Sequence, residues 1–169
     1  MINALQKELK TLKEEENKIL ISEFNSLISN EIKNQPTPFI YERLGEKFRH
    51  YFVDEFQDTS IMQWENLVPL MDNALSSNDG SAMLVGDAKQ SIYRWRGGDA
   101  EQFINLYKGI GNPFQTDAEI RSLDTNFRSY KAVVDFNNSF FGFVSNTSFS
   151  DDDFKELYKD AKQKISLEN

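Results

Sequence analysis

Two acidic residues follow a short apolar segment near the middle of the chain. Residues 51–53 are Tyr-Phe-Val, and Asp54 and Glu55 come directly after them. An apolar run of this length is consistent with a buried strand, and ligands gather at the carboxyl ends of strands in open α/β sheets. An Asp at this position suits a hydrated Mg²⁺ ion, and the neighbouring Glu can orient or deprotonate an attacking water. The pair indicates nucleotide hydrolysis, with a solvated turn as the alternative.

A second stretch combines an amide, two aromatic rings and a guanidinium group within a few residues of another predicted strand. It follows the apolar residues 82–85 and contains Gln90, Tyr93, Trp95 and Arg96. An amide can donate a hydrogen bond to a phosphate oxygen, and an exposed ring can stack on a base of a single strand. The alternative is that both rings are ordinary core residues.

Three segments, in order along the chain, resemble the motifs of superfamily 1A DNA helicases of the UvrD/Rep type. Residues 54–59 (DEFQDT) resemble Walker B, or motif II, residues 86–97 (GDAKQSIYRWRG) resemble motif III, and residues 125–129 (TNFRS) resemble motif IV. Residues 21–25 and 38–45 are more similar to the RecB/AddA branch. The resemblance covers about residues 20–145, so it includes most of the chain.

The resemblance implies a role for individual residues. The implied catalytic residues are Asp54, which would also be the metal ligand, Glu55, Gln90 as the sensor of the γ-phosphate, and Arg128 as an arginine finger. The implied cofactors are ATP and Mg²⁺. Gln57 and Phe127 are implied to serve nucleotide binding, Gln57 by ordering the site and Phe127 by lying against the adenine. Tyr93, Trp95 and Arg96 are implied to contact single-stranded DNA. Asp87 is expected to tie the motif III turn together through hydrogen bonds.

The alternation of predicted strands and helices favours an α/β fold with parallel pairing. Because the strands are few and short, the chain resembles part of such a sheet, and the family resemblance implies a partial RecA-like (P-loop NTPase) motor domain with many helices. The sequence patterns predict helices at 1–17, 18–34, 39–47, 61–76, 100–107, 133–144 and 150–165, and strands at 51–53, 82–85 and 120–123.

The same resemblance suggests how the chain divides. Residues 1–106 would be the C-terminal part of the first motor domain with N-terminal helices, residues 107–119 a linker, and residues 120–169 the start of the second motor domain. The linker prediction depends on two Gly and a Pro within residues 107–119. These residue types interrupt helices and strands.

The phosphate-binding loop of the family, G-x-x-x-x-G-K-[ST], has no counterpart here, because no Gly in the chain is followed by Lys. We therefore expect a fragment of an ATP-dependent DNA helicase, a 3′–5′ single-strand translocase of DNA repair or recombination, that is inactive alone. Its partners would be single-stranded DNA, ATP, the remainder of the helicase chain and another component of a helicase–nuclease complex. The alternative is a truncated, non-catalytic module that binds DNA or a partner. An acidic helical scaffold leaves the three motifs unexplained.

Composition limits these interpretations. The 169 residues are 39% hydrophobic, carry a net charge of −8 and include no cysteine, which excludes disulfides and thiolate metal sites. The negative charge argues against broad electrostatic binding of nucleic acid, so any strand would be held by a local cluster such as Lys89, Arg94 and Arg96. We expect a cytoplasmic protein without a membrane segment, because no apolar run is long enough to span one and no signal sequence is recognisable.

Overall fold

The structure, a computed structural model, describes residues 2–34, 39–148, 155, 157–158 and 161–166. The chain forms two compact units, Met1–Thr116 and Asp117–Asn169, and each is described by itself. The division falls within the segment 107–119. The assignment of the units to two motor domains stays a prediction.

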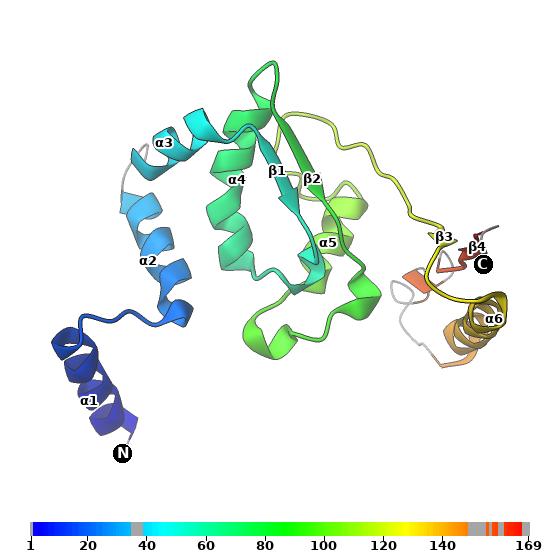
Figure 1. Ribbon diagram of the computed structural model, residues 1–169, viewed down its shortest axis with the longest axis horizontal. Coiled ribbons are helices and arrows are strands. Elements are labelled where there is room, and N and C mark those ends of the chain that lie inside the picture. Colours follow the sequence, from blue (N-terminus) through cyan, green and yellow to red (C-terminus); the bar gives the residue numbers. More distant parts are fainter. Residues whose placement is uncertain (1, 35–38, 149–154, 156, 159–160, 167–169) are drawn as a thin grey trace. The chain divides into compact units, whose positions relative to one another are not determined.

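The first unit contains five helices and two strands among its described residues. They are α1 (Ile2–Glu15), α2 (Ile21–Asn34), α3 (Phe39–Lys47), β1 (His50–Val53), α4 (Ile61–Leu75), β2 (Ser81–Leu84) and α5 (Ala100–Tyr107), with the short 3-10 helices η1 (Phe56–Asp58), η2 (Ala88–Gln90) and η3 (Arg94–Arg96) (Figure 1). Each helix and strand lies within three residues of its predicted bounds. The prediction of many helices and a few short parallel strands is therefore confirmed in this unit.

The two strands pair in parallel, with His50 opposite Ser81 and Val53 opposite Leu84. The ladder continues past the strands, because the Val85 amide donates to the Val53 carbonyl at 2.8 Å and the Phe56 amide donates to the Val85 carbonyl at 3.0 Å. Parallel strands end at the same edge. The turns that follow β1 and β2 are consequently neighbours.

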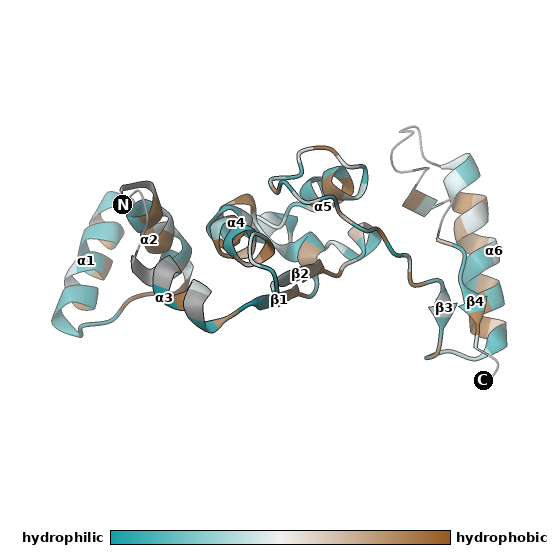
Figure 2. Ribbon diagram, turned by 90° about the horizontal axis from the view of Figure 1, so that it is seen from above, coloured by the Kyte–Doolittle hydropathy of each residue, from teal (hydrophilic) through white to brown (hydrophobic). Residues whose placement is uncertain are grey.

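Helices α4 and α5 lie on one side of the strand pair (Figure 2). Phe56, Trp64 and Met71 form the buried core there, and the Phe56 ring meets Trp64 edge to face at 4.9 Å and Phe103 at 5.6 Å. Both helices begin at capping residues: Ser60 and Gln63 form a capping box at the start of α4, and the Asp99 side chain caps α5.

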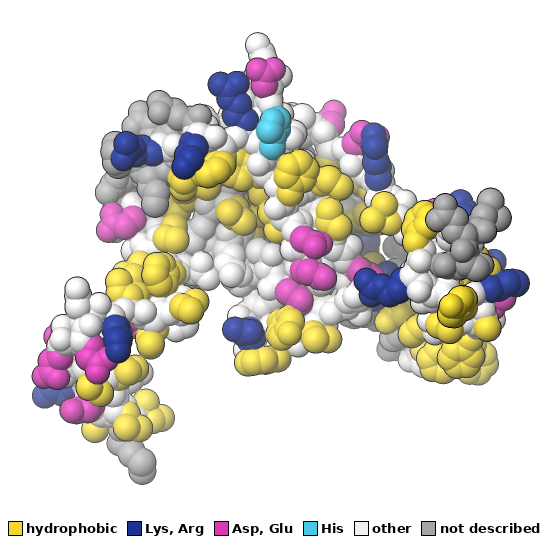
Figure 3. Space-filling view, viewed as in Figure 1, with side chains coloured by type: hydrophobic (Ala, Val, Ile, Leu, Met, Phe, Trp, Pro, Cys, Tyr) yellow, Lys and Arg dark blue, Asp and Glu magenta, His cyan; other side chains and the backbone are white. Residues whose placement is uncertain are grey.

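The opposite face of the strand pair is apolar and exposed. Phe52 and Met83 alternate with the inward-facing strand residues and are 71% and 52% exposed. Figure 3 shows hydrophobic side chains gathered over β1 and β2, with acidic side chains near the strand ends. A parallel sheet is normally covered on both faces, and in the described residues of this unit only one face is covered.

The second unit contains β3 (Thr125–Asn126), α6 (Lys131–Thr147) and β4 (Lys164–Ile165) among its described residues, and β3 pairs in parallel with β4. The predicted strand at 120–123 is wrong, since these residues form no regular structure and Leu123 is 85% exposed. The strand forms at 125–126 instead, where Ser166 donates its amide to the Asn126 carbonyl.

The predicted helix at 150–165 is also wrong at its end, because Lys164–Ile165 is a strand. Its start, with Ser150 and the three Asp, lies outside the described residues. Apolar spacing alone does not distinguish a helix end from a two-residue strand that pairs with a distant partner. None of the described helices combines the length and apolar character needed to cross a membrane.

The two faces of the strand pair make a matched stability test. We predict that Phe56→Ala lowers the free energy of unfolding by about 3–5 kcal/mol, because it empties a fully buried ring site. Phe52→Ala removes the same atoms from an exposed position and should change it by less than about 0.5 kcal/mol. Urea denaturation of the chain measures both, and equal losses would contradict the assignment of the core face.

Candidate functional site

The turn after β1 presents two carboxylates. Asp54 and Glu55 are both exposed, and the Glu55 amide donates to Asp54 Oδ1 at 2.9 Å. Glu55 has φ 52° and ψ 41°, a left-handed conformation that costs a residue other than glycine roughly 1–2 kcal/mol. Such conformations persist where surrounding contacts enforce them, and they cluster at functional sites. Here the enforcing contacts come from Phe56 and Gln57, which are buried immediately behind the acids.

Gln57 is 1% exposed, and both of its polar atoms are bound inside the protein. Its Nε2 donates to Glu55 Oε2 at 2.6 Å, and its Oε1 accepts from the Asp87 amide at 3.0 Å. The side chain thus joins the turn after β1 to the turn after β2. Its predicted role in nucleotide binding stays a prediction.

Asp87 organises the turn after β2, as the sequence analysis expected. Its carboxylate accepts from the Lys89 amide at 3.1 Å, from Lys89 Nζ at 2.6 Å and from Gln90 Nε2 at 3.0 Å. Burial raises the pKa of Asp87, but the hydrogen bonds from Lys89 and Gln90 outweigh it, so that the pKa lies below its usual value of 3.8. Gln90 itself is exposed at the end of η2. The turn therefore offers an amide beside the two acids.

The aromatic residues that follow are on the surface. Trp95 is 79% exposed and Tyr93 is 38% exposed, with their ring centres 6.3 Å apart and tilted by 54°. The Arg96 guanidinium lies 5.5 Å from the Trp95 ring centre and 5.8 Å from that of Tyr93, within cation–π range of both. The alternative that Trp95 is a core residue is wrong.

Backbone contacts fix this aromatic loop to the acidic turn. Gly98 forms an isolated antiparallel bridge with Ser60, and the Asp99 amide donates to the Thr59 carbonyl at 3.2 Å. Gly97 has φ 89°, which glycine adopts readily. Arg94, which was expected to belong to the basic cluster that would hold a strand, pairs with Glu101 Oε1 at 2.8 Å. Of the predicted residues, the structure thus brings together the acids, Gln57 and Gln90, and ties the aromatic loop to them.

The second unit presents Phe127 and Arg128 from a separate turn. Asn126 Oδ1 accepts from the Arg128 amide at 2.9 Å and from the Ser129 amide at 2.8 Å, which shapes the turn between β3 and α6. Phe127 is 70% exposed, and Arg128 is also exposed. Both line a hollow of about 480 Å³ together with Thr125, Asn126 and Gln163. Asn126 was not among the site residues predicted from the sequence, although it directly precedes Phe127 and Arg128.

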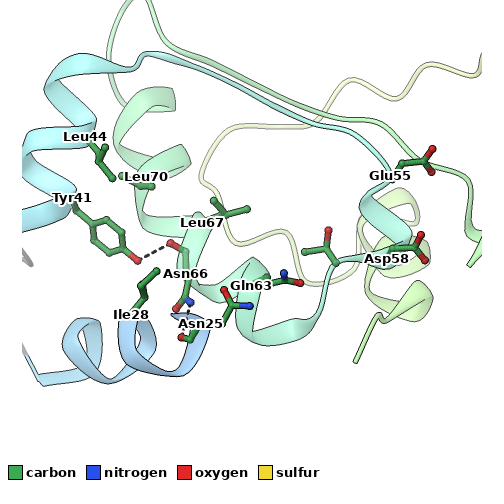
Figure 4. Close-up of a pocket in the computed structure, with 11 residues that line it drawn as sticks. Asn25, Ile28, Tyr41, Leu44, Glu55, Asp58, Gln63, Asn66, Leu67 and Leu70 are labelled. Carbon is green, nitrogen blue, oxygen red and sulfur yellow. Dashed lines mark hydrogen bonds between the residues drawn. The ribbon is translucent and has the colours of Figure 1, made fainter. Parts of the chain in front are cut away.

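A cavity of about 450 Å³ lies between α2, α3, α4 and the acidic turn (Figure 4). Tyr41 donates to the Asn66 carbonyl at 2.6 Å, and Asn66 Nδ2 donates to the Asn25 carbonyl at 3.2 Å. Burial raises the pKa of Tyr41. Glu55 and Asp58 line the end of the cavity far from Tyr41 (Figure 4). This polar network was not predicted from the sequence, because its residues lie on three separate helices and no local pattern relates them.

The acidic turn fits a Mg²⁺ ion held jointly with a nucleotide. In the part of the chain that the structure describes, no group of three or more His, Cys, Asp or Glu forms a metal cage. Mg²⁺ usually takes only one or two carboxylates and completes its shell with water and phosphate oxygens. Asp54 with Glu55, exposed at a strand end, fits that pattern.

Comparison with known proteins places the chain in a family. Residues 1–110 match the family model of the UvrD/REP helicase N-terminal domain. The fold and this match, which covers more than half of the chain, define a helicase N-terminal domain. The chain belongs to the UvrD/REP helicase N-terminal domain family.

Several named helicases are similar to this chain. The chain is 36% identical over 96 residues to one component of the ATP-dependent helicase/nuclease of Bacillus pumilus, 35% over 101 residues to DNA helicase II of Haemophilus influenzae, and 35% over 106 residues to the RecB component of the RecBCD enzyme of Chlamydia muridarum. These matches cover 57%, 60% and 63% of this chain but only 8%, 12% and 10% of the relatives. The chain spans about a tenth of their length.

The lowered pKa of Asp87 predicts a pH dependence of stability. A carboxyl group whose folded pKa is depressed stabilises the fold above its unfolded pKa of about 3.9, and this contribution is lost as the pH falls through the folded value. We predict that Asp87→Asn flattens the loss of stability below about pH 4, measured as the melting temperature of the chain from pH 2 to 7.

Lys89→Met is the companion variant. It removes a hydrogen bond that lowers the pKa of Asp87, so it should partly flatten the same loss of stability below about pH 4. Some acid dependence should remain in both variants, since ion pairs with Lys13 and Lys164 also lower the pKa values of Glu23 and Asp124. If the melting temperature of Asp87→Asn falls below about pH 4 as steeply as that of the wild type, the prediction is contradicted.

Proposed function

We propose that this chain is a section of an ATP-dependent DNA helicase, a 3′–5′ single-strand translocase of DNA repair or recombination. It would carry the Walker B acids, motif III and motif IV of a partial RecA-like motor, closest to the RecB/AddA branch. The observation that supports the proposal is the parallel pairing of β1 and β2, because the turn that carries Asp54 and Glu55 and the turn that carries Gln90 follow neighbouring strand ends, and Trp95 is exposed five residues after Gln90.

The division of labour follows from the chemistry of each side chain. Asp54 would hold a hydrated Mg²⁺ ion, which would supply positive charge to the phosphates of ATP, and Glu55 would orient or deprotonate the attacking water. Gln90 donates to the γ-phosphate and loses that partner after hydrolysis. The resemblance of residues 125–129 to motif IV implies that in an intact motor Arg128 would act as an arginine finger and Phe127 would contact the adenine.

The aromatic loop holds the strand. Trp95 offers a flat and exposed surface on which a base stacks, with Tyr93 beside it, and Arg96 supplies positive charge next to both rings. Stacking tolerates any base. Because the Gln90 turn and the Trp95 loop are consecutive, loss of the γ-phosphate shifts the stacking surface, and hydrolysis is converted into movement along the strand.

A polypeptide that contains this chain together with a phosphate-binding loop tests the enzyme activity. We predict DNA-stimulated ATP hydrolysis whose rate falls about 10²–10⁴-fold in Glu55→Gln and about 10³–10⁵-fold in Arg128→Ala. Arg121→Ala is the matched control, because Arg121 is an exposed arginine of the same unit that pairs with Glu119. The 169-residue chain itself should hydrolyse ATP only at background.

The same measurement decides between the two candidate functions. Robust hydrolysis by the longer polypeptide, absent from the chain, supports the helicase. A longer polypeptide that binds DNA but shows no ATP hydrolysis would support a non-catalytic module. The observation in favour of that second candidate is the exposed aromatic loop, because a ring such as Trp95, 79% exposed beside Arg96, can bind a strand without hydrolysis.

The stacking role of Trp95 has its own test. We predict that Trp95→Ala weakens the binding of oligo(dT) by roughly 5- to 150-fold, the equivalent of the 1–3 kcal/mol lost with one stacked base. Trp95→Phe should retain most of the affinity, because it keeps a ring. Tyr107→Ala, at an exposed aromatic residue on α5, is the control that should bind normally. Equal binding by Trp95→Ala and the control would refute the assignment.

A further inference from the structure

One buried amide connects the two turns of the candidate site. The Gln57 side chain bridges from Glu55 Oε2 to the Asp87 amide, and the backbone carbonyl of Gln57 accepts from Ser91 Oγ at 3.4 Å. Asp87 in turn accepts from the side-chain amide of Gln90. A continuous chain of hydrogen bonds therefore runs from the carboxylate at 55 to the amide at 90. No step of the proposed hydrolysis requires Gln57 to touch the nucleotide.

The surroundings of Gln57 allow only one orientation of its side-chain amide. Nε2 can donate to the Glu55 carboxylate, and Oε1 can accept from the backbone N–H of Asp87. If the amide were flipped, its oxygen would face the Glu55 carboxylate and its NH₂ group would face the Asp87 N–H, so neither hydrogen bond could form. Polar groups left without a partner at a buried position are costly. Burial to 1% exposure leaves no room for water to replace these partners. The amide therefore fixes which way the Glu55 carboxylate faces.

The space around the amide is equally restricted. A Cβ atom built on Gly86 would lie 2.6 Å from Gln57 Oε1. This contact is shorter than van der Waals distance, so a larger residue at position 86 would displace the amide. The left-handed backbone of Glu55 completes the arrangement, because it turns that residue while Gln57, two positions later, stays in the interior.

We propose that Gln57 is a positioning residue that couples the aim of the Glu55 carboxylate to the position of the Asp87–Gln90 turn. A displacement of that turn moves the Asp87 amide, and through Gln57 it moves the carboxylate that orients the attacking water. The proposal rests on the proposed function, since it needs Glu55 to act on a water. It adds a link between the γ-phosphate sensor and the base that does not pass through the nucleotide.

The test uses the longer helicase polypeptide described above, with the wild type as reference. Gln57→Met keeps the length of the side chain and removes both hydrogen bonds, and we expect kcat for DNA-stimulated ATP hydrolysis to fall about 10- to 100-fold, because a small misplacement of a catalytic group is costly. The KM for ATP should stay within about twofold, because the Gln57 side chain is only 1% exposed and its polar atoms are already bound within the protein.

Two further variants separate positioning from folding. Gln57→Glu keeps the shape and the acceptor for the Asp87 amide but opposes the Glu55 carboxylate, so kcat should fall at least as far as in Gln57→Met. Gly86→Ala changes no charge and places a Cβ nearest to the amide, 2.6 Å from Gln57 Oε1 against 3.2 Å from the Phe56 nitrogen and 3.3 Å from the Phe103 ring, so it should lower kcat in the same way. Gln102→Met is the matched control, since Gln102 is a half-buried glutamine that donates to the Thr59 carbonyl and does not contact Glu55.

The outcomes are distinct. A selective loss of kcat in the Gln57 and Gly86 variants, with a normal melting temperature and a normal control, supports the coupling. Unchanged kcat in Gln57→Met overturns it, and so does a parallel loss of kcat, ATP affinity and melting temperature, which marks a merely structural residue. If Gln57→Met does not fold, Gln57→Glu decides by the same criteria. A wild type without DNA-stimulated hydrolysis would instead refute the proposed function.

Discussion

The parallel pairing of β1 with β2 is the constraint on which the site depends. Two strands that run in the same direction bring their following turns to one edge of the sheet, so residues about thirty positions apart in sequence become neighbours. The core on one face, built around Phe56, Trp64 and Met71, holds the pair in place. The acidic turn, the Gln90 turn and the aromatic loop follow as consequences of that single alignment.

Burial and exposure alternate within a few residues of the acidic turn. Asp54 and Glu55 face solvent, whereas Phe56 and Gln57 are almost completely inaccessible. Phe56 stabilises the turn through apolar packing, and Gln57 specifies its geometry through two hydrogen bonds. The strain stored in the left-handed backbone of Glu55 is therefore held by its buried neighbours, which is the arrangement expected where precise placement of a side chain matters.

The helices and strands of the first unit were predicted close to their observed bounds, because residues near each element in the sequence determine where it begins. The Ser60–Gln63 capping box and the Asp99 cap mark the helix starts by short-range hydrogen bonds, and such capping residues can be recognised in the sequence alone. The short strands near 125 and 164 depend on a partner about forty residues away, so no local pattern at 120–123 or 164–165 reveals them. The exposed roles of Trp95 and Arg128 were inferred from the motif resemblance, whereas the link from Gln57 to Asp87 and the Tyr41–Asn66 contact required three-dimensional structure.

The two tryptophans of this chain lie in opposite surroundings. Trp64 is 8% exposed against Phe56 and Phe114, and Trp95 is 79% exposed beside Arg96. Indole emission shifts to the blue in an apolar interior and is quenched by a base stacked on the ring. The protein therefore carries two intrinsic optical reporters: the indole at 64 follows unfolding, and the indole at 95 follows occupancy of the aromatic loop, without any added label.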